Sequence, residues 1–209
     1  MATEKITQEK IINAVLECAF EKGTGATSLS DISEKLNIKK ASLYNHYENR
    51  EAIIDAATRY CADFILKTSF IPAEMDAAAR KYSAEVILKG IATRWFKINC
   101  REPVLQVYSF LNSEKYFSTS AAKAVLDSNK KLTEQAQTAL KSLSDAGKTP
   151  PLTPEKLEFY ASLFISGLNA MLDDTIILKK SELRFSDKDD GLDLTSVEAF
   201  VTRFCSIIQ

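Results

Sequence analysis

The chain has 209 residues, of which 45% are hydrophobic and 26% are charged, and its formal net charge is -1. This composition is typical of a folded globular protein, and it excludes the compositions of disordered, collagen-like and membrane-embedded chains. Because the chain as a whole is almost neutral, it has no general attraction to a polyanion, and a site for nucleic acid would have to be local.

Two features of the sequence predict a cytoplasmic protein. No run of apolar residues approaches the length of a membrane-spanning helix, and the first residues, MATEKITQEK, are polar and lack the apolar stretch of a secretory signal. Separately, the four cysteines lie far apart and form no CxxC pair, so a disulfide framework is not indicated. We therefore expect reduced, mostly buried cysteines.

Apolar residues recur at three- and four-residue spacing along the chain, and strand-like alternation is absent. This periodicity predicts an all-α fold. The first helix is expected to have Thr7 as its N-cap and to end at Lys22, where Gly23 supplies a left-handed terminator.

Short helices are predicted for the segments that follow. Ser28 and Asp31 have the spacing of a capping box at the start of a second helix, which Asn37 ends. A third helix is expected over about residues 39–46. Asn49 is a good N-cap for a fourth helix.

Proline and cap residues mark the later helices. We expect Pro72 and Pro103 in the first turns of two of them, and a long amphipathic helix over residues 118–143.

The last two helices have their own start signals. Thr153 is expected to cap a helix over residues 154–179, because a proline follows it directly. Thr195 and Glu198 have capping-box spacing for a final helix that ends at Ile208.

Residues 28–47, SLSDISEKLNIKKASLYNHY, have the arrangement of a helix-turn-helix motif, in which two short helices are joined by a short turn. In DNA-binding proteins the second helix lies in the major groove. The turn residue must tolerate a positive φ angle, and Asn37 does so better than most residues other than glycine.

On an α-helix over residues 39–46, Leu43 and Tyr47 would face the core, because successive side chains are about 100° apart. The outward side chains would be those of Lys39, Lys40, Ala41, Ser42, Tyr44, Asn45 and His46. Small and amide side chains suit base edges, and the hydroxyl, imidazole and ammonium groups suit phosphate oxygens.

Alternative roles remain for several of these residues. His46, the single histidine of the chain, is interpreted as a DNA contact, but a hydrogen-bonded structural role or a catalytic or metal-binding role is open. Tyr44 could instead pack its ring. Lys39 and Lys40 could be a solvated pair of charges.

The stretch GATSLSDISEKLNIKKASLYNHYENREAIIDA resembles the N-terminal domain of the TetR family of bacterial transcriptional regulators. The specific match covers residues 5–65, and beyond them only the length, the helical content and two long C-terminal helices are similar. The resemblance implies a three-helix DNA-binding domain over residues 5–65, with its motif at about 28–47. It also implies a larger helical domain for ligand binding and dimerisation over residues 66–209.

The resemblance also implies roles for individual residues. Thr27 and Ser28 would touch phosphate at the start of the second helix, and His46 and Arg50 would hold the DNA backbone. The full set of implied DNA-binding residues is Thr27, Ser28, Lys39, Lys40, Ala41, Ser42, Tyr44, Asn45, His46 and Arg50.

For the second domain the resemblance implies a homodimer, built by the last two long helices, and an apolar effector pocket. The candidate interface residues are Ala161, Phe164, Gly167, Leu168 and Met171, and the candidate pocket residues are Trp95, Phe96, Tyr108, Phe110 and Tyr116. A buried central helix within a monomer would have the same pattern as the interface. An ordinary helical core would explain the aromatic residues equally well.

Catalytic and metal-binding motifs are absent from the sequence, so we expect no enzyme activity, no cofactor and no metal. The acidic residues between Ser186 and Asp193 are interpreted as a solvated connection, because an EF-hand would need a glycine where Leu192 stands.

The sequence therefore predicts a ligand-responsive repressor that binds a palindromic operator as a homodimer. Its predicted partners are double-stranded DNA, a second copy of the chain and a small-molecule effector, with no membrane. The alternatives are an activator of the same family, a helical enzyme or small-molecule-binding protein without a DNA function, and a protein-interaction module.

Overall fold

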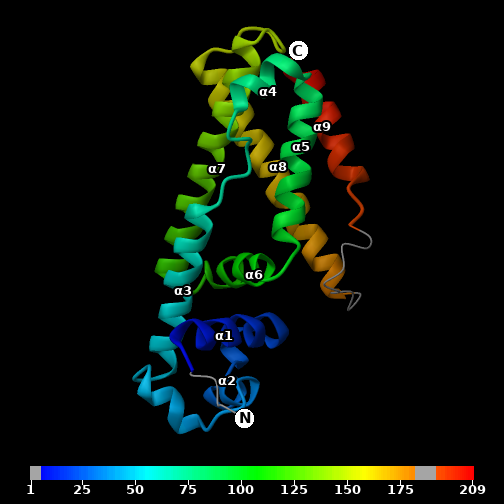
Figure 1. The fold of residues 1–209 in the computed structure, drawn as a ribbon. Helices are drawn as coiled ribbons and strands as arrows, with labels where there is room; N and C mark the ends of the chain where they lie inside the picture. The colour runs from blue at the N-terminus through cyan, green and yellow to red at the C-terminus, as the bar shows by residue number, and fades with distance from the viewer. Residues whose placement is uncertain (1–5, 182–191) are drawn as a thin grey trace. The chain divides into compact units, whose positions relative to one another are not determined.

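The structure is a computed structural model that describes residues 6–181 and 192–209, and within these ranges the regular elements are all helical (Figure 1). The predicted all-α fold is confirmed. In chain order the elements, with η for a 3-10 helix, are α1 (Gln8–Lys22), η1 (Thr24–Ala26), α2 (Leu29–Lys35), η2 (Lys40–Asn45), α3 (Arg50–Lys67), α4 (Met75–Lys81), α5 (Ala84–Asn99), α6 (Val104–Glu114), α7 (Thr119–Asp145), α8 (Pro154–Ser181) and α9 (Thr195–Ile207).

The chain divides into two compact units. Unit 1 comprises Met1–Thr68 and Pro103–Ser128, and unit 2 comprises Ser69–Glu102 and Asn129–Gln209. Helix α6 and the start of α7 therefore pack with the N-terminal helices, although they follow the domain boundary expected near residue 65. The functional division at that boundary stays a prediction.

Helix α1 begins and ends at the predicted residues. The hydroxyl oxygen of Thr7 accepts a hydrogen bond from the Lys10 N–H at 3.3 Å, which satisfies one of the first-turn donors that a helix cannot satisfy itself. Gly23 ends the helix with φ 84° and ψ 151°. The positive φ suits glycine, but the ψ angle is not that of the expected left-handed terminator, because the chain enters η1 directly.

The predicted capping box and turn residue of α2 are both present. The Ser28 N–H donates to the Asp31 carboxylate at 2.7 Å, and the Ser28 hydroxyl oxygen accepts from the Asp31 N–H at 3.2 Å. After the helix, Asn37 has φ 52°, the left-handed conformation that the motif requires. The Ile38 N–H donates back to the Ser33 carbonyl at 2.9 Å and closes the turn.

The third element differs from the prediction, since η2 is a 3-10 helix rather than an α-helix over residues 39–46. Short helices commonly take this tighter form, which has three residues per turn. It begins after Lys39, whose carbonyl accepts from the Ser42 N–H at 2.8 Å. Consequently Ala41 and Tyr44 lie one above the other, and Leu43 is buried as predicted.

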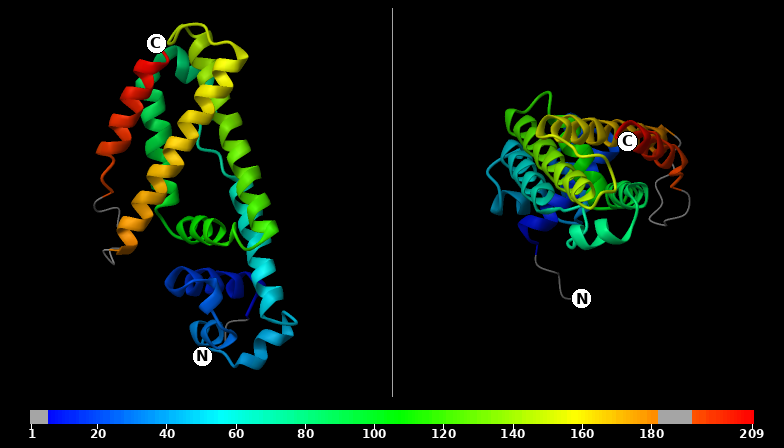
Figure 2. Two further views of the ribbon diagram at one scale, coloured as in Figure 1. Left: turned by 180° about the vertical axis from the view of Figure 1, so that it is seen from behind. Right: turned by 90° about the horizontal axis from the view of Figure 1, so that it is seen from above.

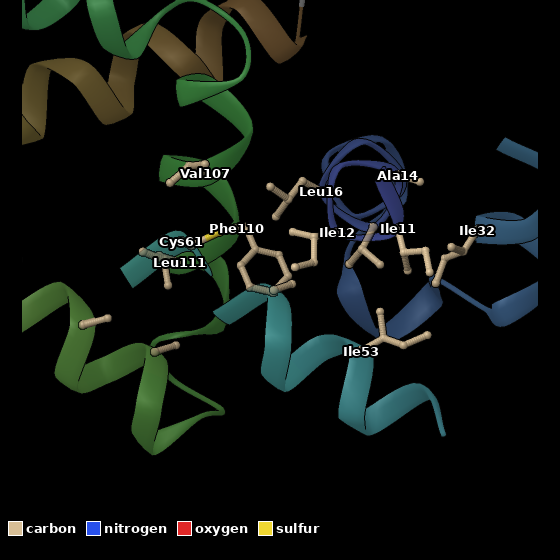
Figure 3. Close-up of a cluster of buried hydrophobic side chains, with 14 of the residues drawn as sticks. Ile11, Ile12, Ala14, Leu16, Ile32, Ile53, Cys61, Val107, Phe110 and Leu111 are labelled. Carbon is tan, nitrogen blue, oxygen red and sulfur yellow. The ribbon is translucent and has the colours of Figure 1, made fainter. Parts of the chain in front are cut away.

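Helix α3 starts at its predicted cap, where the Asn49 side-chain oxygen accepts from the Ala52 N–H at 2.8 Å. Its apolar side joins α1, α2 and α6 in the core of unit 1, which buries side chains from all four helices (Figure 3). The labelled members of this core are Ile11, Ile12, Ala14, Leu16, Ile32, Ile53, Cys61, Val107, Phe110 and Leu111.

Two of the predicted proline and cap positions are wrong. Pro103 directly precedes α6 and serves as its N-cap, but Pro72 lies in a non-helical segment before α4. There the Phe70 N–H donates to the Gln135 side-chain oxygen at 3.0 Å, which helps to fix that segment outside a helix. The expected capping box of Thr195 is also absent, because Thr195 is already the first residue of α9 and its N–H donates to Asp193 at 2.9 Å.

The long helices α7 and α8 confirm their predictions closely. Thr153 caps α8, since its hydroxyl oxygen accepts from the Lys156 N–H at 3.4 Å. Within unit 2, α9 packs against both α5 and α8, and the views in Figure 2 show α9 beside these two helices. Most of the acidic stretch at residues 186–193 falls on residues 182–191, outside the described part of the chain.

Candidate nucleic-acid interface

The predicted recognition surface lies on η2 and the residue before it. Lys39, Lys40, Ala41 and Asn45 are exposed, and Tyr44 is 53% exposed, which is high for an aromatic ring. The packing alternative for the Tyr44 ring therefore has little support. Five side chains that can contact phosphates or base edges thus stand together on the outside of one short element.

Buried side chains on the inner side of η2 anchor this surface to the core of unit 1. Leu43, at the centre of η2, is 1% exposed and belongs to the unit 1 core, as do the partly buried side chains of Ile38 and Tyr47 on either side of the element. The Leu43 carbonyl accepts from the N–H groups of both His46 and Tyr47 at 2.9 and 3.0 Å. Ser42 and His46 are partly buried at the edges of the surface.

Thr27 and Ser28 were expected to touch phosphate. Their donor groups instead make hydrogen bonds within the chain. Thr27 is 1% exposed, and its hydroxyl donates to the Gly23 carbonyl at 3.0 Å. The N–H and the hydroxyl of Ser28 both donate to the Asp31 carboxylate at 2.7 Å. A phosphate at this position would have to compete with a carboxylate that is already bound.

Arg50 also has partners within the chain. Its Nε donates to the Thr27 carbonyl at 2.7 Å, and its Nη2 donates to the Thr24 carbonyl. Its Nη1 lies 3.6 Å from the Glu51 carboxylate. No local pattern in the sequence predicts these bonds, because their acceptors are backbone carbonyls 23 and 26 residues earlier.

Ion pairs join α1 to α2 behind the recognition surface. Lys22 Nζ lies 2.5 Å from the Asp31 carboxylate, and Lys35 Nζ lies 3.0 and 2.8 Å from Glu17 and Glu21. Hydrogen bonds from Lys22 and Ser28 hold the pKa of the Asp31 carboxyl far below its usual value. The charges of Lys22 and Lys35 are thus partly neutralised, and Lys39 and Lys40 are the lysines on the recognition surface itself.

The candidate pocket residues fall into different environments. Trp95 and Phe96 are buried in unit 2, where the Trp95 ring meets that of Phe70 edge to face at 5.7 Å. Phe110 is part of the unit 1 core, and Tyr116, also in unit 1, is 80% exposed. Tyr108 of unit 1 is partly buried.

Most of the candidate dimer-interface residues are packed inside one chain. Ala161, Phe164 and Leu168 are buried, and the Phe164 ring lies 5.0 Å from that of Phe204 in α9. Gly167 contacts α9 as well, because a Cβ at this position would lie 2.7 Å from Cε2 of Phe200. Gly167 therefore allows α9 of the same chain to approach α8 closely. Met171 is partly buried.

No group of three or more histidine, cysteine or acidic side chains close enough for a metal ion occurs within residues 6–181 and 192–209. His46 in particular has no such group around it. The metal-binding alternative for His46 therefore has no support in the described residues.

Comparisons with known proteins show what the chain is similar to. Residues 11–57 match the model of the family described as bacterial regulatory proteins, tetR family. The chain is 44% identical over 64 residues to the biofilm operon icaADBC HTH-type negative transcriptional regulator IcaR of Staphylococcus epidermidis, covering 29% of this chain and 35% of that protein. It is 28% identical over 129 residues to IcaR of Staphylococcus aureus strain Newman, covering 61% of this chain and 66% of that protein.

Solved structures share the fold over nearly the whole chain. A TetR-like transcriptional regulator from Rhodococcus sp. RHA1 has a TM-score of 0.63 at 14% identity, with 97% of this chain and 96% of that chain covered. The transcriptional regulator FadR from Bacillus subtilis, solved in complex with stearoyl-CoA, has a TM-score of 0.57 at 13% identity, with 97% of both chains covered.

An all-helical chain whose N-terminal unit carries a short exposed helix after the turn of its motif has the fold of helix-turn-helix transcriptional regulators. More particularly, residues 11–57 match the tetR family of bacterial regulatory proteins, and a solved TetR-like regulator shares the fold of nearly the whole chain.

Proposed function

We propose that the protein is a homodimeric repressor, which binds a palindromic operator through two copies of the η2 surface and leaves it when a small molecule binds. The observation that carries the proposal is the exposed set of Lys39, Lys40, Ala41, Tyr44 and Asn45 above the buried Leu43. Repression is supported by the staphylococcal relatives, which are named negative transcriptional regulators.

The geometry of η2 suggests which side chains would contact bases and which would contact phosphates. Ala41 and Tyr44 are stacked along one edge, and Ser42 and Asn45 along the next, because the element has three residues per turn. Ala41 and Asn45 would meet base edges, where a methyl group suits thymine and an amide suits adenine. Lys39, Lys40 and the Tyr44 hydroxyl would bind phosphates and fix the register.

The surface of α8 supports self-association. This helix is apolar along much of its length, yet only a minority of its central residues are buried within the chain. A single helix of this kind is weak grounds for a membrane span. Its exposed residues Phe159, Leu163, Ala170 and Ile177 recur at spacings of four and seven along one side. A second copy that covers this stripe would remove apolar surface from water.

The surroundings of Trp95 in unit 2 are our candidate for the effector site. The indole Nε1 is buried, and so is Oδ1 of Asn169 in α8, and neither atom has a hydrogen-bond partner in the described part of the chain. Helices α5 and α8, which carry them, are in contact. A small molecule with both an acceptor and a donor would satisfy these groups.

Selection of random-sequence DNA on the purified protein tests the proposal. We expect an enriched palindrome, bound with an affinity that falls as salt rises. Tyr44→Ala should raise the Kd several-fold without unfolding the protein, while Tyr82→Ala, which removes another exposed ring outside the motif, should leave it unchanged. Enrichment of no sequence by a folded protein would contradict the proposal.

A further inference from the structure

The guanidinium of Arg50 lies between the start of α3 and the loop that leads into α2. Its Nε and Nη2 donate to the carbonyls of Thr27 and Thr24. These two nitrogens form one edge of the planar guanidinium, whose donors are fixed in a fork. The remaining nitrogen, Nη1, faces the Glu51 carboxylate at 3.6 Å.

The two acceptors belong to buried residues. Thr24 is 6% exposed and Thr27 is 1% exposed. The Thr24 carbonyl also accepts from the Thr27 N–H at 3.1 Å, so Arg50 is its second donor. Hydrogen bonds from a charged donor to buried carbonyls stabilise the loop that carries them. The same loop is closed by the Thr27 hydroxyl, which donates to the Gly23 carbonyl at 3.0 Å.

The loop leads directly into the recognition motif. Thr27 precedes Ser28, the N-cap of α2, and α2 leads through Asn37 to η2. Arg50 is the first residue of α3, so a rotation of α3 would pull on the carbonyls of residues 24 and 27 through these hydrogen bonds. The start of α2, which follows Thr27 directly, would then move as well. Rigid hydrogen-bonded connections of this kind keep recognition groups in their productive geometry.

We propose that Arg50 is a positioning residue, which fastens α2 and η2 to the start of α3, and that it is not a ligand of the DNA phosphates. Its bidentate edge is directed at protein carbonyls, and its other side faces a carboxylate, which would repel a phosphate. The inference rests on the proposed DNA-binding function, because the role of Arg50 is to present the η2 surface.

Two substitutions separate a positioning role from a phosphate contact. Arg50→Lys keeps the positive charge but replaces a planar fork with a single ammonium group, which cannot reproduce the paired bonds. Arg50→Gln removes the charge. Arg59→Gln is the matched control, since Arg59 is an exposed arginine on the same helix. The probe is the DNA sequence that the wild-type protein selects from a random pool.

The expected result is a loss of affinity of about tenfold for both Arg50 variants. The slope of log K against log salt should match that of Arg59→Gln, because no phosphate contact is removed. In the free protein, amide hydrogen exchange of residues 24–36 should be faster in Arg50→Lys than in the wild type, while the middle of α3 stays protected.

Two outcomes would overturn the inference. The first is an Arg50→Lys variant that binds DNA as well as the wild type does. The second is an Arg50→Gln variant whose salt slope is smaller by about 0.9 than that of Arg59→Gln, as expected when one phosphate contact is lost. If the wild-type protein selects no DNA, it is the proposed function that fails. In that case hydrogen exchange still tests whether Arg50 fastens α2 to α3. Faster exchange over residues 24–36 in Arg50→Lys than in the wild type supports this role, and unchanged exchange refutes it.

Discussion

The ring of Phe200 in α9 lies directly against the backbone of Gly167 in α8, so that a Cβ at Gly167 would be 2.7 Å from Cε2 of this ring and closer still to Cζ. The ring is also stacked with that of Phe164, at a centroid distance of 6.0 Å, which limits how far it can move aside. The contact fixes how closely the last two helices of one chain pack.

Gly167→Ala should therefore destabilise the protein, by about 1–3 kcal/mol, which is the usual cost of overpacking a core. The matched control is Gly90→Ala in α5, where nothing lies within 4 Å of the added Cβ. Since alanine is the better helix former, this control should be neutral or stabilising by up to about 1 kcal/mol. Urea unfolding of both variants measures the difference, and equal midpoints would contradict the packing argument.

The ion pair of Lys22 with Asp31 predicts a pH dependence of stability. Because the folded pKa of Asp31 is lowered, the carboxylate contributes stability above its unfolded pKa of about 3.9, and this contribution is lost as the pH falls towards the folded pKa. The difference in the free energy of unfolding between the wild type and Asp31→Asn should be largest near pH 7 and should shrink between about pH 5 and pH 2.

Asp55→Asn is a suitable control for the pH experiment, because Asp55 is an exposed carboxylate on α3. Its effect on the free energy of unfolding should be small throughout. A constant difference between wild type and Asp31→Asn over the acid range would show that Asp31 is not stabilised by charge. High salt should reduce the effect, since both partners are partly exposed.

Asn37 adopts φ 52° at the turn between α2 and η2, where a residue with a branched or bulky Cβ is strained. Asn37→Ala should destabilise the protein by about 1 kcal/mol, and Asn37→Gly should be neutral or slightly stabilising. Urea midpoints again test this ordering. A variant Asn37→Ala that is as stable as Asn37→Gly would mean that the backbone conformation of the turn has changed.

The exposed stripe of α8 predicts which substitutions prevent self-association. Leu163→Glu together with Ile177→Glu would place two charges on the apolar stripe that the proposed dimer covers, and the protein should become a monomer in light scattering at micromolar concentration. Leu126→Glu, at an exposed apolar position on α7, is the control and should leave the mass unchanged. A dimeric double variant would place the interface elsewhere.

Local signals in the sequence predicted much of unit 1. Caps and turns depend on side chains only a few residues away, so Thr7, Ser28, Asn37 and Asn49 could be assigned their roles without knowledge of the fold. The helix type of residues 40–45 could not, because a short segment can form either kind of turn and its choice depends on contacts with the rest of the unit.

Non-local partners account for the remaining differences. The carbonyls bound by Arg50 and the lysine beside Asp31 lie in other elements, and no periodicity reveals them. Gly167 was expected to admit a helix from a second chain, but the approaching helix is α9 of the same chain. A small residue in a helix indicates close approach and does not identify the neighbour.

The discontinuity of unit 1 has a consequence for biosynthesis. Its core combines Ile12, Leu16 and Cys61 with Val107, Phe110 and Leu111, and the second group follows after a long interval of chain. On the ribosome, the first 68 residues emerge well before these partners do, at about 5–20 residues per second. The core of the nascent helix-turn-helix segment is therefore incomplete until α6 has been translated.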